Sequence, residues 1–316
     1  MRNAIVLAAG KGTRMHSDLP KVLHKIGDMP MVEVIVKNLK QCGAERIVTV
    51  VGYGREAVTA ALEGQCEFAV QDPQLGTGHA VMQAQQLAGE TGITLVVNGD
   101  AATIQPETLT ALYESIERAD MAVLTVSLPE AGSYGRVIRN ENGDVLRIVE
   151  FKDCSPEEAA VKEINTGIYA FRNEKLFEAL KELKNENAQH EYYITDLVAI
   201  FRSKGWRVTG VSAADMDEVQ GVNDCLELSR SNRWLNRRLT EKWMKAGIQM
   251  ADPETTYIGP FVTIGHDTEL YPNVYLYGET AIGNHVTIMP GAFLRNAAVK
   301  DGAVVKAGVY EDCEIS

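Results

Sequence analysis

The stretch NAIVLAAGKGTRM, residues 3–15, decides how the N-terminal half of the chain is interpreted. An apolar run that ends in glycine is typical of a buried strand followed by a tight turn. Glycine lets backbone N–H groups approach phosphate oxygens closely, and Arg14 and Lys21 add two cations nearby. These residues predict a phosphate-binding turn, although an ordinary turn with solvated charges has the same local pattern.

Two common phosphate-binding motifs are excluded. A dinucleotide fingerprint needs a glycine three places after Gly12, where this chain has Met15. The P-loop pattern G-x-x-x-x-G-K-[ST] occurs nowhere in the sequence. The turn therefore belongs neither to a nicotinamide site nor to a Walker-type ATPase.

Strand-like and helical runs alternate over the first 120 residues. Alternation of this kind predicts βαβ units and a mostly parallel sheet, and strands that are apolar throughout indicate cover on both faces. The expected strands are 3–10, 46–52, 67–71 and 93–100, and the expected helices are 31–41, 55–64, 77–88 and 106–119.

The pattern changes after Asp120, where strand-like runs follow one another. They predict an antiparallel or mixed extension of the sheet, with strands at 121–128, 134–140, 145–151, 164–171 and 206–213, and a helix at 191–205. The polar-rich run from Asp224 to Ala246 predicts a connecting helix, which alternatively packs on the first domain.

The C-terminal tail has a six-residue period. Hexapeptide repeats build a parallel β-helix, with one short strand per repeat and three repeats per turn. Residues 252–316 would supply between three and four turns, with a slip after Leu294 where Val299 and Val305 take over. The repeated aliphatic residues are Ile258, Ile264, Leu270, Leu276, Ile282, Ile288 and Leu294, each followed four places later by a small or β-branched residue.

The composition excludes several classes of protein. The net charge of −12 disfavours sequence-independent binding to nucleic acid or to anionic membranes. The five cysteines are scattered without C-x-x-C spacing, which favours a reducing compartment over a disulfide or metal framework. No apolar run is long enough to cross a membrane or to form a signal peptide, so we expect a cytosolic protein.

The segments LAAGKGTRM (7–15) and LPK (19–21) resemble the signature of the sugar-phosphate nucleotidyltransferases. Further ordered matches make the chain similar to the uridyltransferase half of the bacterial bifunctional uridyltransferase/acetyltransferase family. These matches are QDPQLGTGHAV (71–81), NGD (98–100), YGR (134–136), VEFKD (149–153), EINTG (163–167), EYYITD (191–196) and EVQGVN (218–223).

The resemblance implies a reaction and an architecture. The reaction is UTP plus N-acetylglucosamine 1-phosphate giving UDP-N-acetylglucosamine, a cell-wall and lipopolysaccharide precursor, plus pyrophosphate. The architecture is a Rossmann-like nucleotidyltransferase domain with a mixed, mostly parallel sheet at 1–223, a connecting helix at 224–250 and a short left-handed β-helix at 251–316. Such β-helices form homotrimers, which we expect here.

The resemblance also implies roles for individual residues. Arg14 and Lys21 would be catalytic, and Asp100 with Asn223 would hold Mg²⁺. On the residues alone, Asp100 and Asn223 are equally explained as helix caps, and Glu150 as a surface carboxylate. The residues expected to bind substrates are Leu7, Ala8, Ala9, Gly10, Lys21, Gln71, Gly76, Thr77, Asn98, Gly99, Gly135, Glu150, Asn165 and Asn223.

The chain departs from the family in two respects. The family usually has GDxPL, whereas this chain reads Gly99-Asp100-Ala101-Ala102-Thr103, which predicts a looser loop and leaves sugar specificity open. The family's acetyltransferase residues would lie beyond residue 316, so we expect no acetyl transfer. Alternative functions are a nucleotidyltransferase for another sugar 1-phosphate and a non-catalytic module that binds a nucleotide sugar.

Overall fold

The computed structural model describes residues 1–187 and 189–316, which divide into two units. The first unit comprises residues 1–24 and 31–224, and the second comprises residues 25–30 and 225–316. The short hairpin at residues 25–30 therefore belongs with the C-terminal part of the chain, which the sequence pattern does not indicate.

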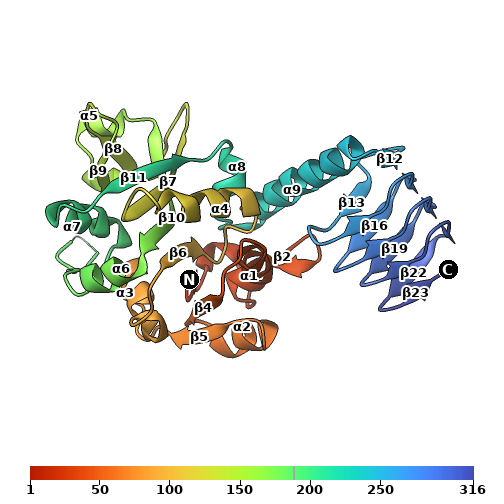
Figure 1. Ribbon diagram of the computed structural model, residues 1–316, viewed down its shortest axis with the longest axis horizontal. Helices are drawn as coiled ribbons and strands as arrows, with labels where there is room; N and C mark the ends of the chain where they lie inside the picture. The colour runs from red at the N-terminus through yellow and green to blue at the C-terminus, as the bar shows by residue number, and fades with distance from the viewer. Residues whose placement is uncertain (188) are drawn as a thin grey trace. The chain divides into compact units, whose positions relative to one another are not determined.

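A nine-stranded mixed sheet forms the centre of the first unit (Figure 1). The main path runs β11-β7-β10-β6-β1-β4-β5; β10 is antiparallel to β6 and β7, and the other neighbours along the path are parallel. Strands β8 and β9 extend from β10 as an antiparallel pair. The bounds are β1 Arg2–Ala8, β4 Arg46–Val51, β5 Glu67–Val70, β6 Ile93–Asn98, β7 Met121–Ser127, β8 Arg136–Arg139, β9 Val145–Val149, β10 Glu163–Arg172 and β11 Val208–Ser212.

Helices cover both faces of this sheet, as the apolar strands predict. Alternate residues of β1 enter different cores: Ala4 and Val6 pack in one, and Ile5 in the other. The first core includes residues of α1 Met31–Gln41, α2 Arg55–Ala61 and α4 Pro106–Ser115; the second includes residues of α3 Thr77–Met82, α6 Asn173–Leu180 and α7 Leu197–Ser203. Two further helices are short, α5 Pro156–Ala159 and α8 Met216–Val219.

Three helical details differ from the sequence-based expectation. The helix expected at 77–88 ends at Met82 and is followed by a 3₁₀ turn, Gln85–Leu87. The helix expected at 191–205 is α-helical only from Leu197, after a 3₁₀ turn. Helix α6 was not predicted.

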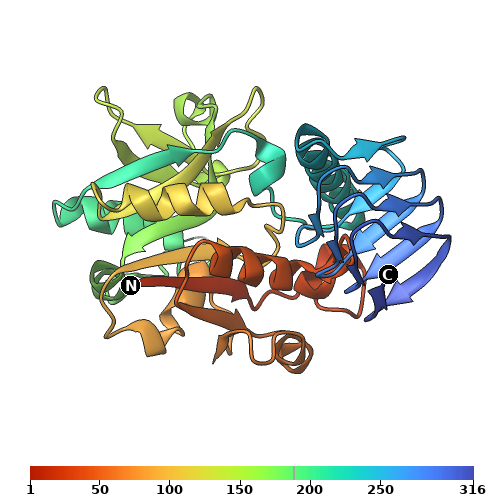
Figure 2. The ribbon, with the colours of Figure 1, turned by 45° about the vertical axis from the view of Figure 1, so that its right-hand side comes forward.

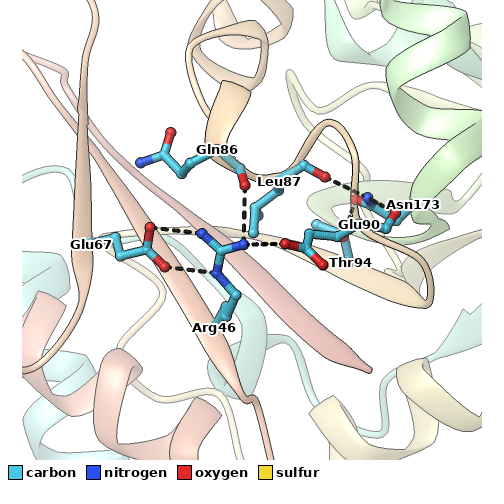
Figure 3. Close-up of polar contacts among 7 residues, drawn as sticks. All are labelled: Arg46, Glu67, Gln86, Leu87, Glu90, Thr94 and Asn173. Atoms are coloured by element: carbon cyan, nitrogen blue, oxygen red, sulfur yellow. Dashed lines mark hydrogen bonds and ion pairs between the residues drawn. The ribbon is translucent and has the colours of Figure 1, made fainter.

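A polar network explains why the chain turns after α3 (Figure 3). The Arg46 guanidinium binds both carboxylate oxygens of Glu67 at 2.9 Å, Oε1 of Glu90 at 2.6 Å and the carbonyl of Gln86 at 3.1 Å. Asn173, at the start of α6, donates to the carbonyls of residues 87 and 90. These contacts hold the segment 85–90 against β4 and β5, so it does not continue as a helix.

The second unit is a left-handed parallel β-helix preceded by α9, Cys225–Lys245. Three parallel sheets form its faces, β12-β15-β18-β21, β13-β16-β19-β22 and β14-β17-β20-β23, and the coils stack on one another (Figure 2). The bounds are β12 Gln249–Met250, β13 Thr256–Ile258, β14 Thr263–Ile264, β15 Glu269–Leu270, β16 Val274–Tyr277, β17 Ala281–Ile282, β18 Thr287–Ile288, β19 Ala292–Arg295, β20 Ala298–Val299, β21 Val304–Val305, β22 Gly308–Glu311 and β23 Glu314–Ile315.

The six-residue period corresponds to inward-facing positions. All seven predicted aliphatic residues, from Ile258 to Leu294, are buried. The predicted slip occurs after Leu294, and Val299 and Val305 are buried in its place. Ala298, which the regular period would place inside, is exposed, because Ala297 and Val299 take the inward positions.

Two asparagines of helix α9 form hydrogen bonds to the rest of the second unit. Asn236 donates to the carbonyl of Thr256 at 2.9 Å and accepts from the N–H of Ile258 at 3.1 Å, which pairs it with β13. Asn232 accepts from the N–H of Gly27 at 2.5 Å, in the turn between β2 Lys25–Ile26 and β3 Met29–Pro30. Among the described residues, no helix is long and apolar enough to cross a membrane.

Candidate active site

The candidate site begins where β1 and β6 end side by side. Leu7 pairs with Asn98, and the N–H of Gly99 donates to the carbonyl of Leu7 at 2.8 Å. Open α/β sheets bind ligands at this carboxyl edge of parallel strands. The register therefore places the glycine-rich turn beside the Asn98–Asp100 segment.

The turn after β1 has a defined shape. Gly12 has φ 64°, and a Cβ atom there would collide with the side chain of Lys21. The carbonyl of Ala9 accepts from the N–H of Tyr53 at 3.0 Å and from Nε2 of Gln74 at 2.5 Å. Ala8 and Ala9 are buried, Leu7 is half-buried and Gly10 is exposed. Two hydrogen bonds to its carbonyl thus fix Ala9, whereas Gly10 remains accessible to solvent.

A cavity of about 330 Å³ lies beside this turn. Its lining is polar and carries one cationic side chain, Lys11, and one carboxylate, Asp18. The lining residues are Lys11, Gly12, Thr13, His16, Ser17, Asp18 and Tyr53.

The two predicted catalytic cations have different surroundings. Arg14 is exposed on the 3₁₀ turn Thr13–Met15, and within the part of the chain that the structure describes it has no hydrogen-bond or ion-pair partner. Lys21 is partly buried and engaged. The structure therefore does not bring Arg14 into the cluster that Lys21 forms.

Lys21 joins two distant segments. Its ammonium forms an ion pair with Oδ2 of Asp100 and donates to Oδ1 of Asn223 at 3.2 Å, although Lys21 and Asn223 are 202 positions apart. The N–H of Val222 donates to the carbonyl of Asp100 at 3.1 Å, which holds the second segment in place. Asn223 lies two residues before α9 begins, at the end of the first unit.

The donor set of this cluster fits a divalent cation. Oδ2 of Asp100 and Oδ1 of Asn223 converge on one point, and the Lys21 ammonium stands there as a cation. The side chains of Lys21 and Asp100 are each 16% exposed, so the cluster is partly desolvated but open to water. One carboxylate and one amide oxygen, completed by waters and phosphates, is the coordination that Mg²⁺ prefers.

Gln71, Gly76 and Thr77 lie together at the start of α3. Nε2 of Gln71 donates to the carbonyl of Gly76 at 2.9 Å and contacts Nδ1 of His79 at 3.2 Å. Oγ1 of Thr77 accepts from the N–H of Ile194 at 3.3 Å, so Thr77 contacts the 191–196 segment. The N-cap of α3 is Gly76 and not Thr77. Both amide hydrogens of Gln71 thus face internal partners.

Four of the predicted substrate-binding residues form a second group. The N–H of Asn165 donates to the carbonyl of Gly135 at 2.9 Å, and the Glu150 carboxylate lies beside Gly135. Oδ1 of Asn165 accepts from the N–H of Gly167 at 3.1 Å, and a Cβ atom at Gly167 would lie 2.7 Å from Nδ2 of Asn98. Since Asn98 ends β6 and Asp100 follows two residues later, this group adjoins the Lys21 cluster.

Glu150 is a half-buried carboxylate in this group. Burial raises the pKa of its carboxyl, and the carboxylates of Asp153 and Asp196 raise that pKa further. Burial likewise raises the pKa of Asp196. Two desolvated carboxyls near each other are suited to accepting hydrogen bonds from sugar hydroxyls.

Three residues that were not predicted from the sequence support the site. Gln74 holds Ala9, and Tyr192 brackets α3: its carbonyl accepts from Gly78 and its N–H donates to Leu75, both at 2.8 Å. Asp196 adds the second desolvated carboxyl. All three lie within the segments 71–81 and 191–196 that carry the family resemblance, which was the available signal.

The looser loop expected after Asp100 is not observed. Ala101, Ala102 and Thr103 are each about 1% exposed, and Oγ1 of Thr103 donates to the carbonyl of Glu218 at 3.0 Å. The residues that replace the family pattern are therefore buried, and Thr103 is bonded to the 218–223 segment.

A larger hollow, about 940 Å³, lies in the second unit. Its lining comes from α9, the hairpin turn and the first coils, and includes Asn232, Arg237, Met244 and Tyr257. None of the predicted site residues lines it, so size alone does not mark the active site.

Comparisons with known proteins agree with this geometry. The MobA-like NTP transferase domain matches residues 4–198, which carry all but one of the predicted site residues. The bifunctional protein GlmU of an Exiguobacterium species (strain AT1b) is 46% identical over 99% of this chain and 70% of its own length. The chain belongs to the GlmU family. GlmU of Halalkalibacterium halodurans (42% identical, 99% and 70%) and of Enterococcus faecalis (45%, 98% and 69%) are similarly related.

A solved structure shows the same fold. The putative glucose-1-phosphate thymidylyltransferase of Bacillus anthracis, in complex with a sucrose, has a TM-score of 0.59 and 24% identity, over 74% of this chain and 95% of that one. Membership of the GlmU family confirms the predicted activity class, a nucleotidyltransferase acting on a nucleotide and a sugar phosphate, and the predicted formation of UDP-N-acetylglucosamine.

Proposed function

We propose that the edge formed by β1, β6 and residues 221–223 catalyses uridylyl transfer from UTP to N-acetylglucosamine 1-phosphate. One observation carries the proposal: Lys21, Asp100 and Asn223 converge beside a glycine-rich turn. The domains we propose are residues 1–223 as the catalytic domain, 224–250 as the connection and 251–316 as the β-helix. In the structure, the hairpin at 25–30 and β12 belong to the same unit as the β-helix. Family membership supports the substrates, because it makes UTP and this sugar phosphate the first pair to test.

The reaction balances without a covalent enzyme intermediate. A phosphate oxygen of N-acetylglucosamine 1-phosphate attacks the α-phosphorus of UTP, the bond from that phosphorus to the β-phosphate bridge oxygen breaks, and pyrophosphate leaves. Such a transfer depends on positioning and charge neutralisation. Backbone N–H groups of residues 8–12 would receive phosphate oxygens, and Arg14 and Lys21 would offset their charge.

Asp100 and Asn223 would hold Mg²⁺ by their side-chain oxygens. When bound, Mg²⁺ supplies positive charge to the phosphate oxygens of the nucleotide. Lys21 leaves its present position between the two oxygens and turns its ammonium toward the substrate phosphates. The Lys21 contacts support this role, since they show that both oxygens accept a common cation.

The remaining groups would select the base and the sugar. With Nε2 of Gln71 committed to internal partners, Oε1 is the atom suited to accept from the uracil N3–H, beside the backbone of Gly76 and Thr77. Glu150 and Asn165, with the backbone of Gly135, would bind the sugar hydroxyls and the N-acetyl group. The surface between the base-binding and sugar-binding groups would be formed by Leu7–Gly10, Asn98 and Gly99.

The test is a panel of substrate pairs. Pyrophosphate release is measured with UTP, ATP, CTP or dTTP against N-acetylglucosamine, glucosamine and glucose 1-phosphates, at saturating Mg²⁺. We expect kcat/KM to be highest for UTP with N-acetylglucosamine 1-phosphate. If another sugar 1-phosphate gives the highest kcat/KM, that compound is the substrate. No pyrophosphate release with any pair would favour a non-catalytic binding module.

We further propose a cytosolic enzyme that takes neither nucleic acid nor a membrane as partner. Five free cysteines agree with a reducing compartment, and the net charge of −12 disfavours polyanionic surfaces.

The polypeptide of 316 residues is expected to show no acetyl transfer. The 316 residues match 70% of the length of the Exiguobacterium relative. In the resembled family, the acetyltransferase residues lie beyond that matched stretch. The measurement is thiol release from acetyl-coenzyme A with glucosamine 1-phosphate, with full-length GlmU as the positive control. Turnover by the 316-residue polypeptide above the no-enzyme rate would contradict this expectation.

We expect a homotrimer assembled through residues 252–316. Tyr257 and Tyr275 stack on the outer face of the β13-β16-β19-β22 sheet with ring centroids 5.0 Å apart, and Val309 on the same sheet is 71% exposed. Light scattering after size exclusion should give three times the monomer mass at micromolar concentration, and a monomeric mass would contradict the trimer.

A further inference from the structure

We propose that His266, Asp267 and His285 form a surface site for one divalent transition-metal ion, represented by Zn²⁺. The three residues are in the second unit, and the proposal does not depend on uridylyl transfer. Nitrogen and oxygen ligand atoms of these side chains all lie within 4.8 Å of one another.

The β-helix brings these residues together by stacking two corners. His266 and Asp267 connect β14 to β15, and His285 connects β17 to β18 one coil later. Because β14 pairs with β17 and β15 with β18, both in parallel register, the two corners lie directly above each other. Although His285 is distant from His266 and Asp267 in the sequence, the stacking of successive coils places the three residues next to one another.

The backbone of both corners is held in place. The N–H of His285 donates to the carbonyl of His266 at 2.9 Å, and the N–H of His266 donates to Oδ1 of Asn284 at 3.1 Å. Asn284 in turn donates to the Asp301 carboxylate from its backbone at 2.8 Å and its side chain at 3.2 Å. These bonds fix the backbone from which the ligand side chains project.

The ligand spacing suits a small ion. Nδ1 of His266 lies 2.8 Å and Nδ1 of His285 lies 3.7 Å from Oδ2 of Asp267. Bond lengths of about 2.0–2.1 Å in a tetrahedral zinc site place neighbouring ligand atoms about 3.3 Å apart. The two distances lie on either side of that value, so small side-chain rotations bring the three atoms onto one ion.

The chemistry of the ligands selects the class of metal. Two imidazoles and one carboxylate suit Zn²⁺, Co²⁺ or Ni²⁺ rather than Mg²⁺ or Ca²⁺, which prefer oxygen. The side chains are 63–68% exposed, which leaves the fourth position to water.

A bound ion would cross-link two successive coils. The ligands come from both coils, so only the folded stack presents all three. Binding to the folded state alone raises the melting temperature of the second unit in proportion to the logarithm of metal concentration.

The experiment titrates Zn²⁺ and Co²⁺ into the metal-stripped 316-residue protein with excess Mg²⁺ present. Three single variants test the ligands: His266→Gln, Asp267→Asn and His285→Asn. Asparagine suits the last two positions, because both have φ 56° and Asn273 and Asn296 adopt the same left-handed conformation elsewhere in the β-helix. His16→Asn, at an exposed histidine of the first unit that also has positive φ, is the matched control.

We expect one equivalent of Zn²⁺ to bind, with affinity reduced about 100-fold or more in each ligand variant and unchanged in the control. Co²⁺ should show ligand-field absorption without a thiolate charge-transfer band, which excludes binding at Cys225 or Cys313. Melting without metal and uridylyl transfer should match the parent in every ligand variant. Equal Zn²⁺ affinity in parent and His285→Asn, or absence of a stoichiometric site, would overturn the proposal.

Discussion

Replacing Asp100 by asparagine is expected to lower kcat/KM for UDP-N-acetylglucosamine formation by about 10³-fold at saturating Mg²⁺. The substitution keeps the shape of the side chain but removes the one negative charge that faces the Lys21 ammonium and the proposed metal position. A loss of 10³-fold corresponds to about 4 kcal/mol of transition-state stabilisation, a reasonable size for a group that positions charge at a transferring phosphoryl. The measurement is steady-state pyrophosphate release.

Asn223→Ala provides an independent test of the same cluster. Its amide oxygen contributes no full charge, so we expect a smaller loss of about 10²-fold, partly relieved by higher Mg²⁺ concentration. Glu117→Gln, an exposed carboxylate beyond α4, is the matched control and should keep full activity. Near-normal turnover of both Asp100→Asn and Asn223→Ala would remove this cluster from the reaction.

Lys21→Ala is expected to lower kcat by about 10²–10³-fold while the KM for UTP changes only a few-fold. The ammonium is most useful against the extra negative charge that gathers on the α-phosphate and the leaving pyrophosphate, so its loss affects the transition state more than the bound substrate. Arg14→Ala should lower kcat in the same sense. Initial rates over a matrix of UTP and sugar-phosphate concentrations separate the two parameters.

The contact between Lys21 and Asp100 makes these effects non-additive. In the double variant Lys21→Ala/Asp100→Asn, the loss of kcat/KM should be smaller than the product of the single losses, since the residues share one site. Lys21→Arg should retain more activity than Lys21→Ala because it keeps the charge. A pure KM effect for Lys21→Ala and Arg14→Ala would restrict both residues to ground-state binding.

The parts of the fold that repeat were predictable from the sequence. Apolar runs with glycine beside them correspond to β1, β4 and β6, because a strand covered on both faces has no polar side. The six-residue period predicts the β-helix because each inward position recurs once per strand. Even the slip after Leu294 was visible, since Val299 and Val305 restore the pattern.

The missed helical details depend on distant contacts. Helix α6 begins at Asn173, which is fully buried and bonds Thr94 at 2.6 Å, and the local sequence does not show that pairing. The end of α3 depends on Arg46, whose bonds to Gln86 and Glu90 come from a strand more than thirty residues earlier. Local propensity cannot anticipate either partner.

The site was predictable in composition but not in geometry. The motif positions of Lys21, Asp100 and Asn223 suggested a shared role, whereas their convergence depends on the register that pairs Leu7 with Asn98 and on the Val222 bond to Asp100. Sequence proximity and the family signature both group Arg14 with Lys21, yet Arg14 is exposed on its 3₁₀ turn whereas Lys21 is paired with Asp100.

We propose that the uridylyl group is transferred at the cluster of Lys21, Asp100 and Asn223. The decisive measurement is a ³¹P NMR time course with UTP, N-acetylglucosamine 1-phosphate and Mg²⁺, run in parallel on the parent and on folded Asp100→Asn protein. We predict that the parent forms UDP-N-acetylglucosamine and pyrophosphate in equal amounts as UTP disappears, and that the variant leaves UTP unchanged over the same period. Equal product formation by both proteins would contradict the account.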